Sequence, residues 1–243
     1  MKIQEDQIIG ELVANDYRTA SVFKKYGIDF CCQGSRTIGD ACASDQIDDH
    51  LVISDLNALL EAPSANTTDY SSWPLDLLAD YIEKKHHRYV VEKSLEIKPY
   101  LNKICSVHGG RHPELLTIKD HFNATADALA QHMKKEELIL FPFVRQMVQA
   151  QHDNSKWESA PFGTIENPIA MMMEEHTTEG DRLRQIETLS NHYTPPADAC
   201  NTYMVTIALL KEFEQDLHLH IHLENNILFP KAIALEKELS QKN

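Results

Sequence analysis

A histidine followed four residues later by a glutamate occurs twice in this chain, each time inside the same eleven-residue pattern. The first copy is His132–Pro142, HMKKEELILFP, and the second is His220–Pro230, HIHLENNILFP, 88 residues later. Both fit H-x-x-x-E-x-x-I-L-F-P. Residues four apart on a helix share a face, with Cβ atoms about 5–6 Å apart. The imidazole and the carboxylate of each copy can therefore converge on one metal ion.

Two further histidines precede the copies at similar distances. His86 lies 46 residues before His132, and His176 lies 44 residues before His220. A fixed-period repeat of this size indicates an internal duplication with units larger than those of a solenoid. Along the chain the order is therefore His, H-x-x-x-E, His, H-x-x-x-E, which is the order of ligands expected for a two-metal site in a four-helix bundle. The predicted metal ligands are His86, His132, Glu136, His176, His220 and Glu224.

Apolar residues at helical spacing place these six residues on faces that should be buried. The stripe through Leu78 and Ile82 leads to His86, so His87 is expected to be solvated. A buried carboxylate without a partner costs several kcal/mol, which is why such groups are paired or bind metal. His218 and His222 point to the opposite side of their helix. They are expected to be a partly exposed pair, with a second, outward metal site as the alternative.

Four long amphipathic segments, with nothing strand-like between them, predict an all-α fold containing an up-down-up-down four-helix bundle. Pro99 should kink or interrupt the first helix, and Pro142 and Pro230 should kink the second and fourth at equivalent places. A long loop is expected at 151–166. The four helices are expected at about 74–104, 113–149, 167–190 and 198–239.

The chain is expected to divide into a small helical domain at 1–62, a polar linker at 63–73 and the bundle at 74–243. In the small domain, a helix should run from Arg18 to Tyr26 and end at Gly27, with further helical segments at 41–50 and 53–62. About 60 residues is marginal for an independent core, so this domain should pack against another unit. A homodimer is one such arrangement.

Composition excludes several classes of partner. The formal net charge of −14 argues against nucleic acid and anionic membranes. No apolar run approaches the roughly 18 residues that a membrane span needs. The start, MKIQEDQIIGELV, lacks the basic and then apolar plan of a signal peptide. The 5 cysteines are an odd number, which indicates reduced thiols and a cytoplasmic location.

The ligand set indicates which metal would bind. If each glutamate bridges two metals, each metal receives two nitrogens and two carboxylate oxygens, and an oxo or hydroxo ion can complete a bridged pair. Structural zinc prefers closed, thiolate-rich tetrahedral sites and fits poorly. Imidazole with carboxylate suits iron, with manganese as second choice. Two iron ions per chain are therefore expected, with an open position for a small ligand.

The sequence resembles a known protein family. The two H-x-x-x-E copies with His86 and His176 resemble hemerythrin-like di-iron proteins, and YGIDFCCQG resembles the cysteine-pair domain of iron–sulfur cluster repair proteins. Together they resemble the repair-of-iron-centres family of the YtfE and ScdA type. The resemblance implies a cytoplasmic di-iron protein that restores clusters damaged by nitric oxide or peroxide. It also implies that Glu175 is an acidic residue near the site.

The adjacent cysteines Cys31 and Cys32 are open to two interpretations. They are either small buried residues or an exposed, reactive pair, and the resemblance favours a role in iron or cluster transfer. Neighbouring Cα atoms are only about 3.8 Å apart, so adjacent cysteines rarely bond to each other. Cys42, Cys105 and Cys200 stand alone and are expected to be structural.

Three functions fit these features. The first is repair of damaged iron–sulfur proteins, with iron supplied by the di-iron site and handed on by the cysteine pair. The second is a carrier or sensor of oxygen or nitric oxide. The third is an enzyme that reduces nitric oxide or peroxide at the two metals. The cysteine pair favours repair.

Overall fold

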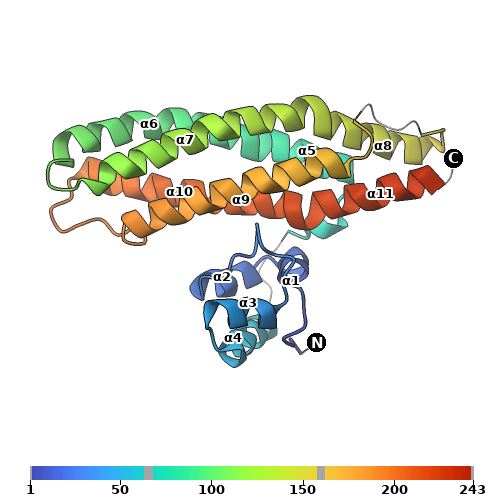
Figure 1. The fold of residues 1–243 in the computed structure, drawn as a ribbon, viewed down its shortest axis with the longest axis horizontal. Coiled ribbons are helices and arrows are strands. Elements are labelled where there is room, and N and C mark those ends of the chain that lie inside the picture. Colours follow the sequence, from blue (N-terminus) through green and yellow to red (C-terminus); the bar gives the residue numbers. More distant parts are fainter. Residues whose placement is uncertain (1, 63–67, 158–161, 242–243) are drawn as a thin grey trace.

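The computed structural model describes residues 2–62, 68–157 and 162–241. In these ranges every named element is a helix, and Ile8 and Thr37 form an isolated antiparallel β-bridge. Long packed helices follow a small helical domain (Figure 1). The prediction of an all-α fold with a hemerythrin-like bundle is confirmed.

The bundle consists of four antiparallel helical segments, which we call legs and number in chain order (Figure 1). The second leg contacts the first and the third, and the fourth contacts the first. A helix pair joined by a short connection places its apolar faces toward each other, which buries one core along the length of the bundle. The legs are α5 (Leu75–Tyr81), η2 (Ile82–His87) and α6 (Arg88–His108); α7 (Glu114–Lys135), η3 (Glu136–Leu140) and α8 (Phe141–Asp153); α9 (Glu166–Leu189); and α10 (Asn201–Leu223), η4 (Glu224–Leu228) and α11 (Phe229–Gln241).

The elements η2, η3 and η4 are π-helical turns, in which the wider hydrogen bond accommodates about one extra residue. Two of them end directly before Phe-Pro, at Pro142 and Pro230. Proline donates no N–H and its ring clashes with the carbonyl four residues earlier. The distortions expected at Pro142 and Pro230 therefore take the form of π-helical turns.

Pro99 does not interrupt its helix, so that part of the expectation is wrong. The helix α6 continues from Arg88 to His108 through Pro99. Leu95, the residue four positions earlier, is 71% exposed. Pro99 is exposed as well, so this turn of the helix faces solvent, where water can replace the hydrogen bond that proline does not donate.

The N-terminal domain consists of four short helices: α1 (Ile9–Asn15), α2 (Thr19–Lys25), α3 (Ile38–Asp45) and α4 (Asp49–Glu61). Ile9, Phe23, Ile38 and Leu56 are fully buried in its core. Gly27 has a φ of 71° directly after α2, in the left-handed region that glycine adopts at a helix end. The linker predicted at 63–73 lies partly outside the described residues, and Tyr70–Ser72 within it forms a 3₁₀ turn, η1.

The N-terminal domain lies against the middle of the bundle, beside α9, α10 and α11 (Figure 1). Phe30 packs against the rings of His218 and His222, and its carbonyl accepts a hydrogen bond from Asn226 Nδ2 at 3.1 Å. His222 is 1% exposed and His218 is half-buried. The expectation of a partly exposed histidine pair is therefore wrong for His222, because the small domain covers that face of α10.

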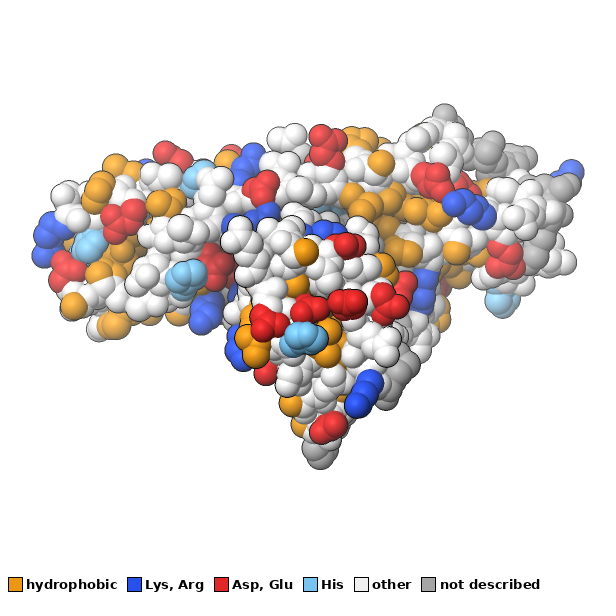
Figure 2. All heavy atoms as spheres, turned by 60° about the horizontal axis from the view of Figure 1, so that its bottom comes forward, with side chains coloured by type: hydrophobic (Ala, Val, Ile, Leu, Met, Phe, Trp, Pro, Cys, Tyr) orange, Lys and Arg blue, Asp and Glu red, His pale blue; other side chains and the backbone are white. Residues whose placement is uncertain are grey.

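Side chains on the outer face of the N-terminal domain are largely acidic. Figure 2 shows carboxylates gathered across the surface that this domain turns to the viewer. A shallow hollow on this domain is lined by Glu5, Asp6, Asp40 and Asp49. The negative charge is thus displayed on the surface, where it repels the phosphates of a nucleic acid. Among the described residues, no helix combines the length and apolarity needed to span a bilayer.

Candidate metal centre

Two groups of buried side chains meet in the centre of the bundle, each with two histidines and the same two glutamates. The first group contains His87 and His220, and the second contains His132 and His176. Glu136 and Glu224 belong to both groups. Within each group the potential ligand atoms lie within 4.8 Å of one another. The four legs of the bundle supply these residues together, from η2, α7, η3, α9, α10 and η4.

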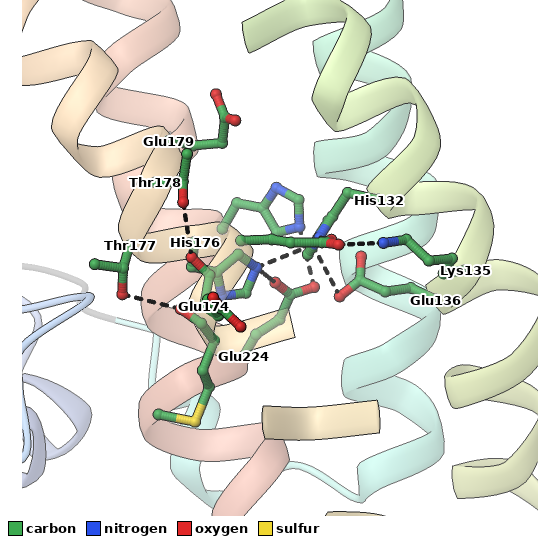
Figure 3. A network of polar contacts seen from close by, with 12 residues as sticks. His132, Lys135, Glu136, Glu174, His176, Thr177, Thr178, Glu179 and Glu224 are labelled. Carbon is green, nitrogen blue, oxygen red and sulfur yellow. Dashed lines mark hydrogen bonds and ion pairs between the residues drawn. The ribbon is translucent and has the colours of Figure 1, made fainter. Parts of the chain in front are cut away.

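The carboxylates of Glu136 and Glu224 each direct one oxygen to the first group and the other oxygen to the second. Glu136 Oε2 lies 3.3 Å from His87 Nε2, and Glu136 Oε1 lies 3.3 Å from His132 Nε2. Glu224 Oε1 lies 3.0 Å from His220 Nε2, and Glu224 Oε2 lies 3.1 Å from His176 Nε2. Figure 3 shows Glu136 and Glu224 converging with His132 and His176. Each carboxylate therefore has one oxygen beside a histidine of each group.

Several of these atoms are buried without satisfying hydrogen bonds. Both oxygens of Glu136, Glu224 Oε2 and His87 Nε2 have no hydrogen-bond partner among the described residues. Glu136, Glu224 and His220 have no exposed surface. Unsatisfied buried polar atoms are costly, and here they point at common positions. These nitrogen and oxygen atoms therefore fit metal ions that prefer imidazole and carboxylate ligands.

Electrostatics keep the two carboxylates ionised. Burial and the neighbouring Glu224 would raise the pKa of Glu136, but His132 and His87 outweigh both and lower it. Burial likewise opposes ionisation of Glu224, yet His220 and His176 hold its pKa well below the usual range. Burial would lower the pKa of His132, but Glu136 reverses this and raises it to about 9. The site thus presents charged oxygens to a cation.

The structure brings His87 into the site and leaves His86 outside both groups. His87 is 2% exposed, so the expectation that it is solvated is wrong. His86 Nδ1 lies 3.0 Å from Asp216 Oδ2, and its ring stacks on that of His220. The π-helical turn η2 (Ile82–His87) explains the shift. Its extra residue brings the His87 ring to Glu136, whereas the His86 side chain, which is also buried, contacts Asp216. Regular α-helical spacing could not reveal this.

Outer hydrogen bonds hold the histidine rings in place. His132 Nδ1 lies 2.8 Å from Glu175 Oε2, and Glu175 also pairs with Lys135. His87 Nδ1 contacts Glu137 Oε1 at 2.8 Å. Such partners orient ligating imidazoles and fix which nitrogen carries the proton. Glu175 thus lies near the centre, as the family resemblance implies, and it contacts His132 as well as Lys135.

An amide from η4 performs the same task for His176 and extends the network to the small domain. Asn225 Oδ1 lies 2.8 Å from His176 Nδ1, and Asn225 Nδ2 donates to the carbonyl of Cys31 at 3.0 Å. Sequence reasoning missed Asn225 and Glu137. Their only signal is that each directly follows a predicted glutamate ligand.

The cysteine pair lies where the N-terminal domain meets the bundle. Cys31 is 4% exposed and Cys32 is half-buried, and both thiols are free. The neighbouring Cys32 thiol, burial and Asp29 together raise the pKa of Cys31 well above its ordinary value. The Cys31 thiol therefore keeps its proton and is not an exposed nucleophile. Of the other cysteines, Cys42 and Cys105 are buried, whereas Cys200 is exposed.

Comparison with known proteins agrees with both parts of the chain. Residues 78–232 match the hemerythrin HHE cation-binding domain family, and residues 5–60 match ScdA_N, a domain of unknown function. The iron–sulfur cluster repair protein ScdA of Staphylococcus haemolyticus is 30% identical over 94% of this chain and 99% of its own length.

The iron–sulfur cluster repair protein YtfE of Escherichia coli is 33% identical over 95% of this chain and 98% of its own length. Both relatives are thus matched across the small domain and the bundle together. The chain belongs to the family of iron–sulfur cluster repair proteins in which an ScdA_N domain precedes a hemerythrin domain.

Proposed function

We propose that this protein holds two iron ions in the bundle and repairs damaged iron–sulfur clusters by supplying iron. The observation that carries this proposal is the pair of shared carboxylates, Glu136 and Glu224, each with one oxygen directed at either metal position. The relatives that match nearly the whole chain are named iron–sulfur cluster repair proteins. The ligands would be His87, His132, Glu136, His176, His220 and Glu224.

Iron suits this site better than zinc. Each position offers two imidazoles and two carboxylate oxygens, a donor set typical of iron, with manganese second. An oxo or hydroxo bridge would complete a bound pair and leave room for a small ligand. We place the activity in the cytoplasm, where the 5 free cysteines would stay reduced. The clients would be iron–sulfur proteins damaged by nitric oxide or peroxide.

A second function is supported by an opening between α7 and α9. A cavity of about 400 Å³ reaches His132 and His176 and is lined also by Glu175, Glu179 and Arg182. Oxygen, nitric oxide or peroxide could reach the metals along it. A carrier, a sensor or a reductase at the same centre is therefore the alternative to repair.

Metal analysis and iron transfer test the proposal. The purified protein should contain two irons per chain and show near-ultraviolet oxo-to-iron bands. The iron-loaded protein should restore the activity of a cluster-depleted enzyme under reducing conditions, with loss of its own iron. Reversible ligand binding without loss of iron would favour the carrier, and sustained turnover with an electron donor would favour the reductase. Zinc alone, or no metal after iron reconstitution, would rule out the di-iron centre.

A further inference from the structure

Three potential ligands gather outside the bundle core, in the loop that follows α2. The Oδ1 atom of Asp29 and the sulfurs of Cys31 and Cys32 lie within 4.8 Å of one another. We propose that these residues form a separate metal site that binds one thiophilic divalent cation, of the Fe²⁺ or Zn²⁺ kind, through two thiolates and one carboxylate. Its donors are sulfur-rich, unlike those of the bundle.

The distances within this group match a tetrahedral ion. Metal–sulfur bonds of about 2.3 Å at tetrahedral angles place two sulfurs about 3.8 Å apart. The sulfurs of Cys31 and Cys32 are 3.7 Å apart. With an oxygen at about 2.0 Å, the sulfur–oxygen separation should be about 3.5 Å. Asp29 Oδ1 lies 3.4 Å from the Cys31 sulfur. Two of the three separations thus match those of a tetrahedral ion, and the third, between the Cys32 sulfur and the Asp29 carboxylate, is within 4.8 Å.

The backbone of the same loop holds this arrangement. Asp29 Oδ1 accepts hydrogen bonds from the backbone N–H groups of Cys31 at 3.1 Å and Cys32 at 2.8 Å. These bonds tie the carboxylate to the peptide units that carry both thiols. The carboxylate cannot swing away without breaking them, which preorganises the three ligands.

A guanidinium lies beside the proposed ligands. Arg184 Nη1 of α9 donates to Asp29 Oδ2 at 2.9 Å, and the same side chain also pairs with Asp181. Two thiolates and one carboxylate would carry three negative charges, of which a divalent cation offsets two, and the Arg184 guanidinium contacts the carboxylate that carries the third. Binding of the cation forms two metal–sulfur bonds and releases the two thiol protons to solvent, with no change of oxidation state.

Three protein ligands leave the fourth tetrahedral position open. A cavity of about 280 Å³ at the junction of the two domains is lined by Asp29, Cys31, Gly180 and Arg184, among others. A water molecule or a donor atom of an acceptor protein could complete the coordination from this side. Open positions of this kind distinguish exchanging metal sites from closed structural ones.

The proposed site touches the bundle next to a metal-centre histidine. The Cys32 thiol donates to the carbonyl of His176 at 3.3 Å. Gly180 permits this approach, since a Cβ there would lie 3.1 Å from the Cys32 sulfur. A role for this site in passing iron between the bundle and a client rests on the proposed iron-donating function. Binding of the cation at Asp29, Cys31 and Cys32 does not depend on that function.

Cobalt titration tests the site directly. The full-length protein is first loaded with iron in the bundle, and Co²⁺ is then added under reducing conditions. One Co²⁺ per chain should bind with intense near-ultraviolet sulfur-to-cobalt bands and visible bands of a tetrahedral ion. Absence of sulfur-to-cobalt bands in the wild-type protein would overturn the proposal, as would bands that survive in the Cys31→Ser/Cys32→Ser double variant.

Two further variants sharpen the assignment. Asp29→Asn keeps an oxygen for the two N–H groups but loses the charge, so the Co²⁺ affinity should fall about tenfold or more. The matched control is Cys200→Ser, which removes an exposed thiol elsewhere and should leave the bands unchanged. Loss of the bands in this control would overturn the assignment.

The same double variant separates the site from the proposed function. If the wild-type bands appear and the variant loses them but still restores clusters at the normal rate, the metal site stands and its part in iron transfer fails. If the wild-type protein never donates iron yet binds Co²⁺ through sulfur, the proposed function fails alone.

Discussion

The bundle core and the cysteine loop, residues 29–32, both gather metal-type ligands, but they assemble them in different ways. The core draws its ligands from all four legs, up to 137 residues apart in the sequence, as between His87 and Glu224. The cysteine loop takes its ligands from four consecutive residues and orders them with its own backbone N–H groups. The core site therefore depends on the packing of the whole bundle, whereas the loop site depends on local hydrogen bonds and on docking.

The two regions also differ in what burial does to their charged groups. In the core, imidazoles outweigh burial and keep Glu136 and Glu224 ionised. In the loop, the Cys32 thiol, burial and Asp29 together hold the pKa of the Cys31 thiol well above its ordinary value. A cation must therefore displace thiol protons in the loop, while it meets charged carboxylates in the core.

The largest effect is expected from removing a shared carboxylate. Glu224→Leu or Glu136→Leu removes one oxygen from both metal positions, so bound iron should fall from two per chain to one or none. Metal analysis of the purified variants measures this. Glu137→Leu is the control, because Glu137 contacts only His87 Nδ1. It should keep both irons, with affinity lower by about 10–100-fold. Two irons in both shared-carboxylate variants would refute bridging.

The next largest effect separates the adjacent histidines. His87→Leu should lose the iron bound with His220, leaving about one iron per chain. His86→Leu should keep two irons, because His86 contacts Asp216 and lies in neither group. Iron content and the oxo-to-iron bands of the two variants provide the comparison. The reverse pattern would restore His86 as the ligand and exclude the register shift at η2.

A smaller effect is expected at the docking face. Phe30→Ala removes a buried ring that packs on His218 and His222, at a cost of about 3–5 kcal/mol. The N-terminal domain should open more often, so modification of Cys31 by a thiol reagent should become faster. Iron in the bundle should stay at the wild-type level. Loss of iron would show that the metal centre of the bundle depends on docking of the N-terminal domain. Unchanged protection of Cys31 would show that the Phe30 ring does not hold this domain against the bundle.

The smallest effect should come from a single docking hydrogen bond. Asn226→Ala leaves the buried Phe30 carbonyl without its donor, which typically costs about 1–3 kcal/mol. Cys31 modification should accelerate less than in Phe30→Ala. Measured rates in the order wild type, Asn226→Ala, Phe30→Ala would support docking as the protection of the cysteine loop. Faster modification in Asn226→Ala than in Phe30→Ala would contradict it.

Much of the bundle could be predicted from local sequence. The H-x-x-x-E copies place a histidine and a glutamate on one helical face whatever surrounds them, and His132–Glu136 and His220–Glu224 do converge in the structure. The four legs follow the apolar periodicity, with helix ends within a few residues of those expected. These features depend on the 3.6-residue period of the helix, which the sequence displays directly.

The tertiary structure decided the rest. The presence of His87 rather than His86 beside Glu136 follows from a π-helical turn, which α-helical spacing does not show. The burial of His222 and the nearness of Cys32 to His176 follow from docking of the small domain onto α9 and α10. Sequence alone determined which residues could bind metal, because residue type and helical period are local properties. Which of them meet depends on contacts between distant segments, and only the folded chain brings those together.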